Sequence, residues 1–340
     1  MAKVNLLTIH FGQCFGAVLQ TYSTCCLLEQ AGHSVVVINL IDPNQRGNYK
    51  RISYWKNSFR EFQFWIFKKK YFPKLTKKAY IIQDISLPEA DYTIVGSDQV
   101  WNRDITGGFG KTFFLDFVST QPKVALSSSF GKSIWLEDQQ YTSEVKELLK
   151  QFKVISVRET TGIDILHDIF NLSAFNLPDP TIGYGKFDDL LLNNKPIRKI
   201  YPFLLVPSYK AMEIVSCISH ELDLPILKLN KFKLKFCNGP RAWLTRIKNA
   251  DYIITDSFHG LALSVIFNKQ FYVLCADEKK FTRLKSLLQL LSLDDRFILN
   301  CEDFIERKEI LTRPIDYNKV NVILDMLKRS YSEFISRFIS

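Results

Sequence analysis

Residues 4–40 read VNLLTIHFGQCFGAVLQTYSTCCLLEQAGHSVVVINL, and this stretch decides the fold class. The apolar runs at 4–9 and 34–40 have the length and the β-branched content of buried strands. Between them, apolar residues recur at helical spacing over 17–31, and Gly32 ends the pattern. Strand, helix and strand in this order predict a parallel sheet, because parallel neighbours need a crossover connection.

The same alternation continues along the 340 residues. Further strands are expected at 92–95, 123–127, 154–157, 199–206, 226–229, 252–255 and 271–275. Further helices are expected at 137–150, 161–170, 210–222, 241–249, 261–268 and 280–291, and an amphipathic helix at 318–338 closes the chain. We therefore expect an α/β protein with two Rossmann-like domains, 1–185 and 199–340, joined by a polar linker at 186–198. Ligands of such domains bind at the carboxyl ends of the strands.

The net charge of +10 is concentrated in one insertion of the first domain, at 51–80. This segment holds nine Lys or Arg and one acid, so the rest of the chain is nearly neutral, which argues against a broad nucleic-acid-binding face. Trp55, Phe59, Phe62 and Ile66 share a helical spacing. Two interpretations stay open: a helix pair packed on its own domain with Lys68, Lys69 and Lys70 solvated, or an aromatic and basic patch for an anionic membrane surface.

The seven cysteines are odd in number and lack the spacing of metal ligands. We interpret them as reduced thiols, and we expect neither a metal site nor a disulfide framework. No apolar run approaches the roughly 18 residues that span a bilayer. The expected localisation is cytoplasmic, with the basic segment as the part that could reach the inner face of the plasma membrane.

The stretch TDSFHG at 255–260 follows an apolar strand and precedes a helix. Free N–H groups at a helix start favour an anion, and a histidine there can donate or accept a proton. The alternative is structural: Asp256 or Ser257 caps the helix and His259 packs against the strand.

Three other strand exits carry polar residues. GSDQVWN at 96–102 is either a ligand-binding loop or a polar turn with one packed tryptophan. Arg158 ends a buried strand and suits a carboxylate or phosphate, although an interdomain ion pair with Glu159 or another acid is the alternative. The turn at 11–16 contains two glycines but matches neither a dinucleotide fingerprint nor a P-loop.

Taken together, these motifs resemble the polysaccharide pyruvyl transferase family in order and almost end to end. FGAVLQTY at 15–22 is similar to the family's opening NYGAVLQAY. IVGSDQVWN at 94–102, VRE at 157–159 with DPT at 179–181, and TDSFHG at 255–260 match its later blocks. The segment at 283–296 resembles its closing region. GSDQVWN and TDSFHG at this separation are the specific features, and the others support them.

The resemblance implies a GT-B-like architecture, with two Rossmann-like domains facing a cleft. It also implies transfer of the enolpyruvyl portion of phosphoenolpyruvate to two hydroxyls of a sugar, with release of phosphate. The acceptor would be a bacterial surface polysaccharide, such as capsule or exopolysaccharide, or its lipid-linked precursor. No cofactor and no nucleic-acid partner are expected. The alternatives are a GT-B glycosyltransferase that uses a nucleotide sugar, and a non-catalytic carbohydrate- or membrane-binding module.

The candidate catalytic residues are three. His259 is the proton donor or an anion ligand, Asp98 is the base or a ligand of the acceptor hydroxyl, and Asp256 orients the histidine. Some relatives carry Arg-Leu-His where this chain has Ser257-Phe258-His259, and Arg283 is a candidate to replace the missing arginine. The candidate substrate-binding residues are Arg158, Ser257, Phe258, Gly260, Gly96, Ser97, Gln99, Trp101, Asn102, Gly16 and Arg283.

Overall fold

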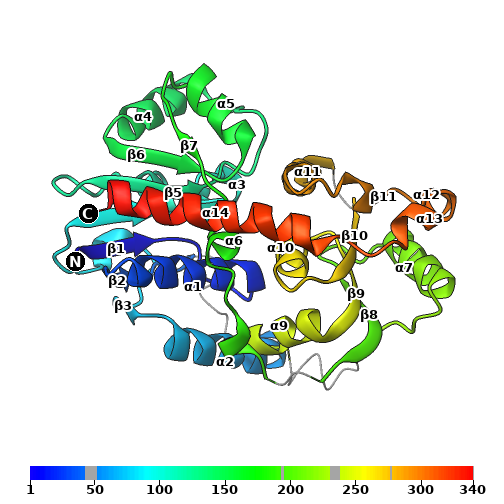
Figure 1. Cartoon of the computed structure of the whole chain (residues 1–340). Helices are drawn as coiled ribbons and strands as arrows, with labels where there is room; N and C mark the ends of the chain where they lie inside the picture. The colour runs from blue at the N-terminus through cyan, green and yellow to red at the C-terminus, as the bar shows by residue number, and fades with distance from the viewer. Residues whose placement is uncertain (43–51, 193–194, 230–237, 276–277, 340) are drawn as a thin grey trace. The chain divides into compact units, whose positions relative to one another are not determined.

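The computed structural model describes residues 1–42, 52–192, 195–229, 238–275 and 278–339, and it divides into two compact units (Figure 1). Unit 1 comprises Met1–Tyr184 together with Leu327–Ser340, and unit 2 comprises Gly185–Met326. Each unit is built on one β-sheet whose paired strands all run parallel. The expected α/β class is confirmed.

Unit 1 follows the predicted alternation closely. Its strands are β1 (Lys3–Leu7), β2 (Ser34–Val37), β3 (Lys74–Leu75), β4 (Tyr92–Val95), β5 (Lys123–Ser128), β6 (Phe152–Val157) and β7 (Phe175–Asn176). Its helices are α1 (Phe15–Gln30), α2 (Ile52–Tyr71), α3 (Arg103–Thr106), α4 (Gln139–Leu149), α5 (Thr160–Asp168) and α6 (Pro180–Tyr184), with 3-10 turns η2 (Ile82–Asp84), η3 (Gly107–Phe109) and η4 (Thr112–Phe114). The described part of the basic insertion is thus one helix followed by an edge strand, which corrects the expected helix pair. Trp55 lies outside the residues whose side chains are described.

The seven strands of unit 1 have the order β3-β2-β1-β4-β5-β6-β7. The chain first builds outward from β1 through β2 to β3, and it then returns to the other side of β1 with β4. The direction of growth therefore reverses between β1 and β4. Such a reversal leaves a crevice at the carboxyl ends of the two strands, where α/β sheets bind their ligands.

Both faces of the unit 1 sheet are covered by apolar side chains. One face packs against α4 and α5, and the other packs against α1 and the end of the last helix, α14 (Tyr317–Phe338). Because its strands are buried on both sides, β4 and β5 are buried at every position. Figure 1 shows α14 in red beside α1.

The end of the chain belongs to unit 1, which corrects the expected domain 199–340. Leu327–Ser340 joins unit 1 because Tyr331, Phe334 and Ile335 of α14 are buried in the cluster that includes β1, β4 and β5. The expected linker at 186–198 is also corrected, since Gly185 begins unit 2. Phe187 and Leu190 are buried there, so this segment is part of a folded unit.

Unit 2 contains the smaller of the two sheets. Its strands are β8 (Ile197–Phe203), β9 (Ala250–Thr255), β10 (Gln270–Leu274) and β11 (Phe297–Ile298). Its helices are α7 (Tyr209–Glu221), α9 (Pro240–Asn249), α10 (Phe258–Ile266), α11 (Glu278–Leu290), α12 (Cys301–Glu306), α13 (Lys308–Leu311) and the first part of α14, with 3-10 turns η5 (Asp188–Leu190) and η6 (Asp294–Arg296).

The strand order of unit 2 is β11-β10-β9-β8. The strand expected at 226–229 is reduced to one parallel bridge between Ile226 and Ile200 of β8. This bridge lies on the side of β8 that does not pair with β9, because Ile200 also pairs with Tyr252. The chain therefore passes from β8 to one neighbour and then back to β9 on the other side, so unit 2 also reverses at β8.

The cysteines and the lengths of the helices can also be compared with the sequence expectations. Cys217 of α7 and Cys301 of α12 form a disulfide, so the interpretation of all cysteines as reduced thiols is wrong for this pair. Their spacing of 84 residues gave no signal, because the two helices meet only in the folded unit. Among the described helices, none combines the length and the apolar character needed to cross a bilayer.

Candidate functional site

The loop after β4 in unit 1 carries the GSDQVWN block and lies at the reversal point between β1 and β4. Gly96 has φ +113°, and a Cβ there would lie 2.3 Å from the backbone oxygen of Leu126. Asp98 has φ +74° and forms a parallel bridge with Ser128, the last residue of β5. The glycine thus lets the loop pass against β5 and brings the Asp98 carboxyl to the sheet edge.

Arg158 follows β6 and binds three carboxylates of unit 1. Its Nη1 donates to Asp179 Oδ2 at 2.7 Å, its Nη2 to Asp98 Oδ1 at 3.3 Å, and its Nε to Glu159 Oε1 at 3.3 Å. The side chain is 1% exposed. Burial lowers the pKa of the guanidinium, but the three carboxylates outweigh that effect and hold the pKa above its ordinary value. Arg158 therefore forms ion pairs, but all three acids belong to unit 1, so the expected ion pair between domains is corrected to one within a single unit.

The three carboxylates around Arg158 are themselves held in place. Asp179 Oδ1 accepts a hydrogen bond from the backbone N–H of Thr181 at 2.9 Å and so caps α6. Glu159 accepts one from the hydroxyl of Ser129. Asp98 Oδ1 accepts one from the backbone N–H of Gln99 at 2.8 Å. Of the three, Asp98 has the most exposed side chain, at 14%, so it is the member of the cluster that can meet a ligand.

Other members of the GSDQVWN block hold the loop. The Ser97 hydroxyl donates to the backbone oxygen of Ser127 at 2.7 Å. Asn102 caps α3 and donates from Nδ2 to Gln99 Oε1 at 2.9 Å. Trp101 is buried, donates from Nε1 to the backbone oxygen of Phe113, and stacks on Phe114. The structure gives these side chains a packing role, and their contact with substrate stays a prediction.

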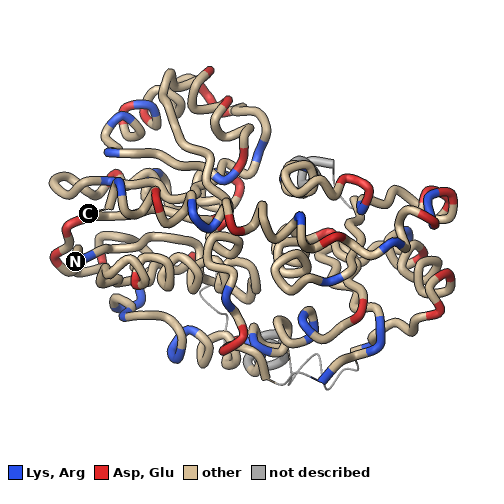
Figure 2. Tube along the Cα trace, in the orientation of Figure 1, with Lys and Arg blue, Asp and Glu red and all other residues tan. Residues whose placement is uncertain are grey.

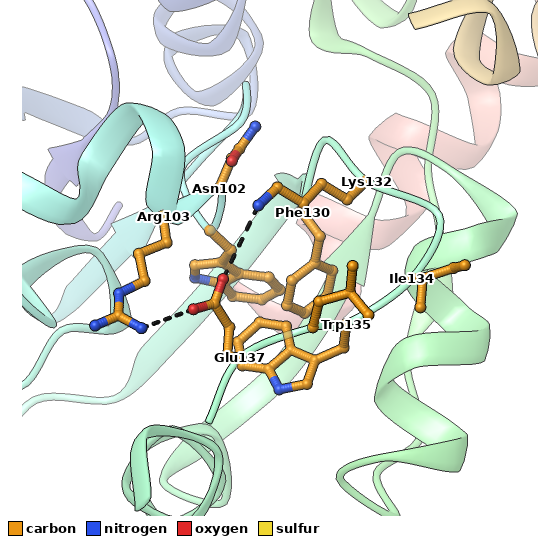
Figure 3. Close-up of a pocket in the computed structure, with 9 residues that line it drawn as sticks. Asn102, Arg103, Phe130, Lys132, Ile134, Trp135 and Glu137 are labelled. Carbon is orange, nitrogen blue, oxygen red and sulfur yellow. Dashed lines mark hydrogen bonds and ion pairs between the residues drawn. The ribbon is translucent and has the colours of Figure 1, made fainter. Parts of the chain in front are cut away.

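A small pocket adjoins this loop, lined by Trp101, Asn102 and Arg103 and by residues of 130–137 (Figure 3). Glu137 lies between two cations there. Its Oε2 is 2.7 Å from Arg103 Nη1, and its Oε1 is 4.0 Å from Lys132 Nζ. The pocket's enclosed volume is about 10 Å³, room for one water rather than for a sugar. Ion pairs of Glu137 with Arg103 and Lys132 line this pocket, and at this volume it has no room for a sugar.

Gly16 lies in the first turn of α1, on the β1 side of the same reversal point. The buried Gln20, one turn further on, donates from Nε2 to Thr8 Oγ1 at 2.9 Å and to the Ile9 backbone oxygen at 3.0 Å. The Thr8 hydroxyl in turn donates to the Ser97 backbone oxygen at 3.0 Å. A chain of buried polar contacts thus fixes the loop after β1 against the loop after β4.

In unit 2, TDSFHG joins β9 to α10 at the carboxyl end of the sheet. Ser257 caps α10, its hydroxyl accepting from the backbone N–H of Gly260 at 3.4 Å. A Cβ on Gly260 would lie 2.3 Å from Thr255 Oγ1, so α10 packs directly on the end of β9. His259 stands in the first turn of α10 and is half-buried, with its ring 5.4 Å from that of Phe258.

Asp256 links the exits of β8 and β9. Its Oδ1 accepts from the backbone N–H of Leu205 at 2.6 Å, and its Oδ2 accepts from that of Val206 at 2.9 Å. Both carboxylate oxygens therefore brace the loop after β8, a role that the sequence did not suggest. That Asp256 also orients His259 stays a prediction. Arg283 is half-buried on α11, the helix that follows β10 in the same unit.

Sequence reasoning missed Asp179 and Ser129 as members of the Arg158 cluster. A signal existed for Asp179, because an aspartate directly before a proline is a typical helix start. Nothing marked Ser129, whose role depends on how β5 and β6 align. Among the residues that the structure describes, no group of three His, Cys, Asp or Glu is arranged to hold a metal ion.

Comparison with known proteins gives a family and a fold. The family model described as polysaccharide pyruvyl transferase matches residues 15–274. Medicago truncatula UGT71G1, solved in complex with UDP-glucose, is 13% identical with a TM-score of 0.50, over 98% of this chain and 96% of that chain. Arabidopsis thaliana UGT89C1 is 9% identical with a TM-score of 0.51, over 98% and 95%. At such identities the likeness shows the GT-B fold alone. None of the curated proteins matches the sequence.

Proposed function

The chain belongs to the polysaccharide pyruvyl transferase family, and we propose that it transfers pyruvate as a ketal from phosphoenolpyruvate to two hydroxyls of a sugar. The acceptor is a bacterial surface polysaccharide or its lipid-linked precursor. One observation carries the proposal: the two specific family motifs lie at the carboxyl ends of strands where each sheet reverses its order, the usual ligand-binding place of such sheets.

We assign the anionic donor to the start of α10. Phosphoenolpyruvate is a compact anion, and N–H groups at the start of a helix suit anions. His259 in the first turn is the candidate to protonate the methylene carbon or to bind the phosphate. Arg283 on α11 is the candidate second cation.

We assign the acceptor hydroxyl to Asp98. Its carboxylate is held by Arg158 and by the N–H of Gln99, and it is the most exposed of the three acids on that arginine. Arg158, by contrast, is enclosed by carboxylates, so we assign it to positioning Asp98 rather than to binding phosphoenolpyruvate.

The proposed reaction balances as follows. One sugar hydroxyl adds to the carbon that carries the phosphate, the methylene carbon takes up a proton and becomes a methyl group, and phosphate leaves. The second hydroxyl adds to the same carbon and closes the ketal. One of the two hydroxyl protons is balanced by the proton that the methyl group gains, and the other by the proton that leaves with phosphate. The transfer therefore needs no cofactor.

The test is phosphate release from phosphoenolpyruvate in the presence of acceptor glycan. We expect the H259A and D98N variants to lose about 10²–10⁴ in rate, as for the removal of an acid or base. The matched controls are H220A and D104N, which change exposed residues of the same types in the same units. Wild-type rates in H259A and D98N would overturn the residue assignment.

Exchanging the donor in the same assay tests the reaction class. Sugar transfer from a nucleotide sugar, with no response to phosphoenolpyruvate, would favour a GT-B glycosyltransferase and overturn pyruvyl transfer. Mass and NMR analysis of the surface glycan from cells with and without the protein then identifies the acceptor.

A further inference from the structure

Helix α2 has two faces of opposite character. Phe64 and Phe67 are buried, with Phe64 5.3 Å from the ring of Phe15 and Phe67 6.1 Å from that of Tyr22. Both partners belong to α1. Phe64 and Phe67 thus anchor the described part of the helix on unit 1.

The opposite face exposes large apolar side chains. Phe62, Trp65 and Ile66 are 48%, 51% and 42% exposed. Together with Lys69 they follow the spacing i, i+3, i+4 and i+7, which places them on one side of a helix. Phe62 and Trp65 stack with ring centroids 5.7 Å apart, and Lys69 Nζ lies 5.0 Å from the Trp65 ring. We name these four residues the α2 face.

The charge around the α2 face is basic. Exposed lysines follow it in the sequence at positions 70, 74, 77 and 78, and blue segments recur along this part of the chain (Figure 2). Glu61 is the one acid between residues 51 and 80. The remainder of the chain is nearly neutral, so this charge is a local feature of the surface.

We propose that the α2 face is a docking surface for a bilayer that contains anionic phospholipid. Tryptophan and phenylalanine favour the headgroup region, and lysines beside them meet lipid phosphates. The combination is what selects a bilayer: aromatic rings that stand out from a rigid helix, with cations on the same face and its edge. Exposed lysines beside exposed aromatic rings match a surface that is anionic outside and apolar beneath, as a bilayer with anionic phospholipid is.

The first test is flotation of the full chain with lipid vesicles. The proposal does not depend on the proposed reaction, and it is measured without substrate. We expect binding to vesicles with 30% phosphatidylserine at low salt, weaker binding at high salt, and little binding to phosphatidylcholine alone. Absence of flotation with the anionic vesicles at low salt, or equal binding to both kinds, would overturn the proposal.

Matched variants locate the surface. K69Q/K70Q is expected to lower binding about fivefold per lysine, the effect of ~1 kcal/mol for a charge at an anionic surface. The control K3Q/K319Q removes the same charge from exposed positions elsewhere and should leave binding within twofold. F62S/W65S should abolish flotation. The control L136S changes an exposed apolar residue of unit 1 outside α2, and it should leave flotation intact.

Unchanged far-UV circular dichroism and thermal midpoint confirm that each variant is folded. Equal loss in the control lysine variant would overturn the location at α2. Failure of the wild type to float, together with self-association that W65S removes, would instead assign the face to a second copy of the chain.

Discussion

Arg158 is a single residue on which three elements of unit 1 converge. It follows β6, and it holds Asp98 from the loop after β4 and Asp179 from the start of α6. The charges in the cluster are one cation and three carboxylates, so the arginine cannot be removed without leaving buried acids unpaired.

We expect R158A to lose ~3–5 kcal/mol in the free energy of unfolding at pH 7, the usual result of removing one partner of a buried ion pair. The loss should shrink at acid pH, where protonation relieves repulsion among the remaining carboxylates. Urea denaturation at several pH values measures both effects. R103A, which breaks surface ion pairs at a solvent-exposed arginine, should cost far less. Equal losses in the two variants would contradict the account.

His10 is a second buried, ionisable residue of unit 1. It is fully buried after β1, with Nδ1 3.0 Å from the Thr8 backbone oxygen. Burial, and secondarily the charge of Lys68, lower its pKa from 6.5 to about 4. The unfolded chain therefore binds a proton between pH 6.5 and 4 that the folded chain does not, and stability falls as the pH drops through this window.

By pH 4 the wild type should have lost ~3 kcal/mol through this group. An H10N variant should show a flatter dependence of unfolding free energy on pH between 6.5 and 4. H167N changes an exposed histidine and should retain the wild-type slope. Chemical denaturation across that pH range gives the slopes, and identical slopes for H10N and wild type would disprove the assignment.

At the scale of elements, the junction of β4 with its loop depends on a glycine. Gly96 combines a positive φ with the closest approach to the backbone of β5, whereas Gly32, after α1, has φ +86° and nothing within 4 Å of an added Cβ. Alanine substitutions at these two glycines therefore separate the free-energy cost of a positive φ from the cost of a Cβ that clashes with Leu126.

G32A should lower the free energy of unfolding by ~1 kcal/mol, the strain of a left-handed residue. G96A should cost ~3 kcal/mol or more, because backbone atoms of β5 have to move as well. Thermal unfolding of the two variants side by side gives the difference. A smaller loss for G96A than for G32A would contradict the described contact with Leu126.

Most elements could be predicted from the sequence, because their signals are local. The run YTIV coincides with β4, and the caps and apolar spacings placed α9, α10 and α14 within a few residues. The interactions that build the candidate site could not be predicted in this way. Asp98 and Asp179 lie 60 and 21 residues from Arg158, and only the order of β4, β5 and β6 in the sheet brings them together.

In the whole molecule, the sequence predicted two α/β halves but not that the chain returns to the first half at its end. Amphipathic spacing identified α14 as a helix that buries one face. It did not indicate whether that face packs on the sheet of unit 1 or of unit 2. The structure assigns the second half of α14 to unit 1, where Tyr331 packs against Gly183 and lies 3.2 Å from the Ser127 hydroxyl.

A Y331A variant should destabilise unit 1 by ~3–5 kcal/mol, the cost of deleting a fully buried aromatic ring. Hydrogen exchange should show lost protection in β1, β4 and β5, while β9 and β10 of unit 2 keep theirs. Y331F keeps the ring and should lose no more than ~1 kcal/mol. Loss of protection confined to unit 2 would disprove the assignment of α14.

The return of the chain to unit 1 also has a consequence during biosynthesis. Residues 1–184 leave the ribosome first, yet the apolar face of their sheet that α14 covers stays open while all of unit 2 is being made. At typical elongation speeds that interval lasts on the order of ten seconds. The nascent protein thus carries an unfinished hydrophobic surface for as long as unit 2 takes to be made, and chaperones can bind it there during that time.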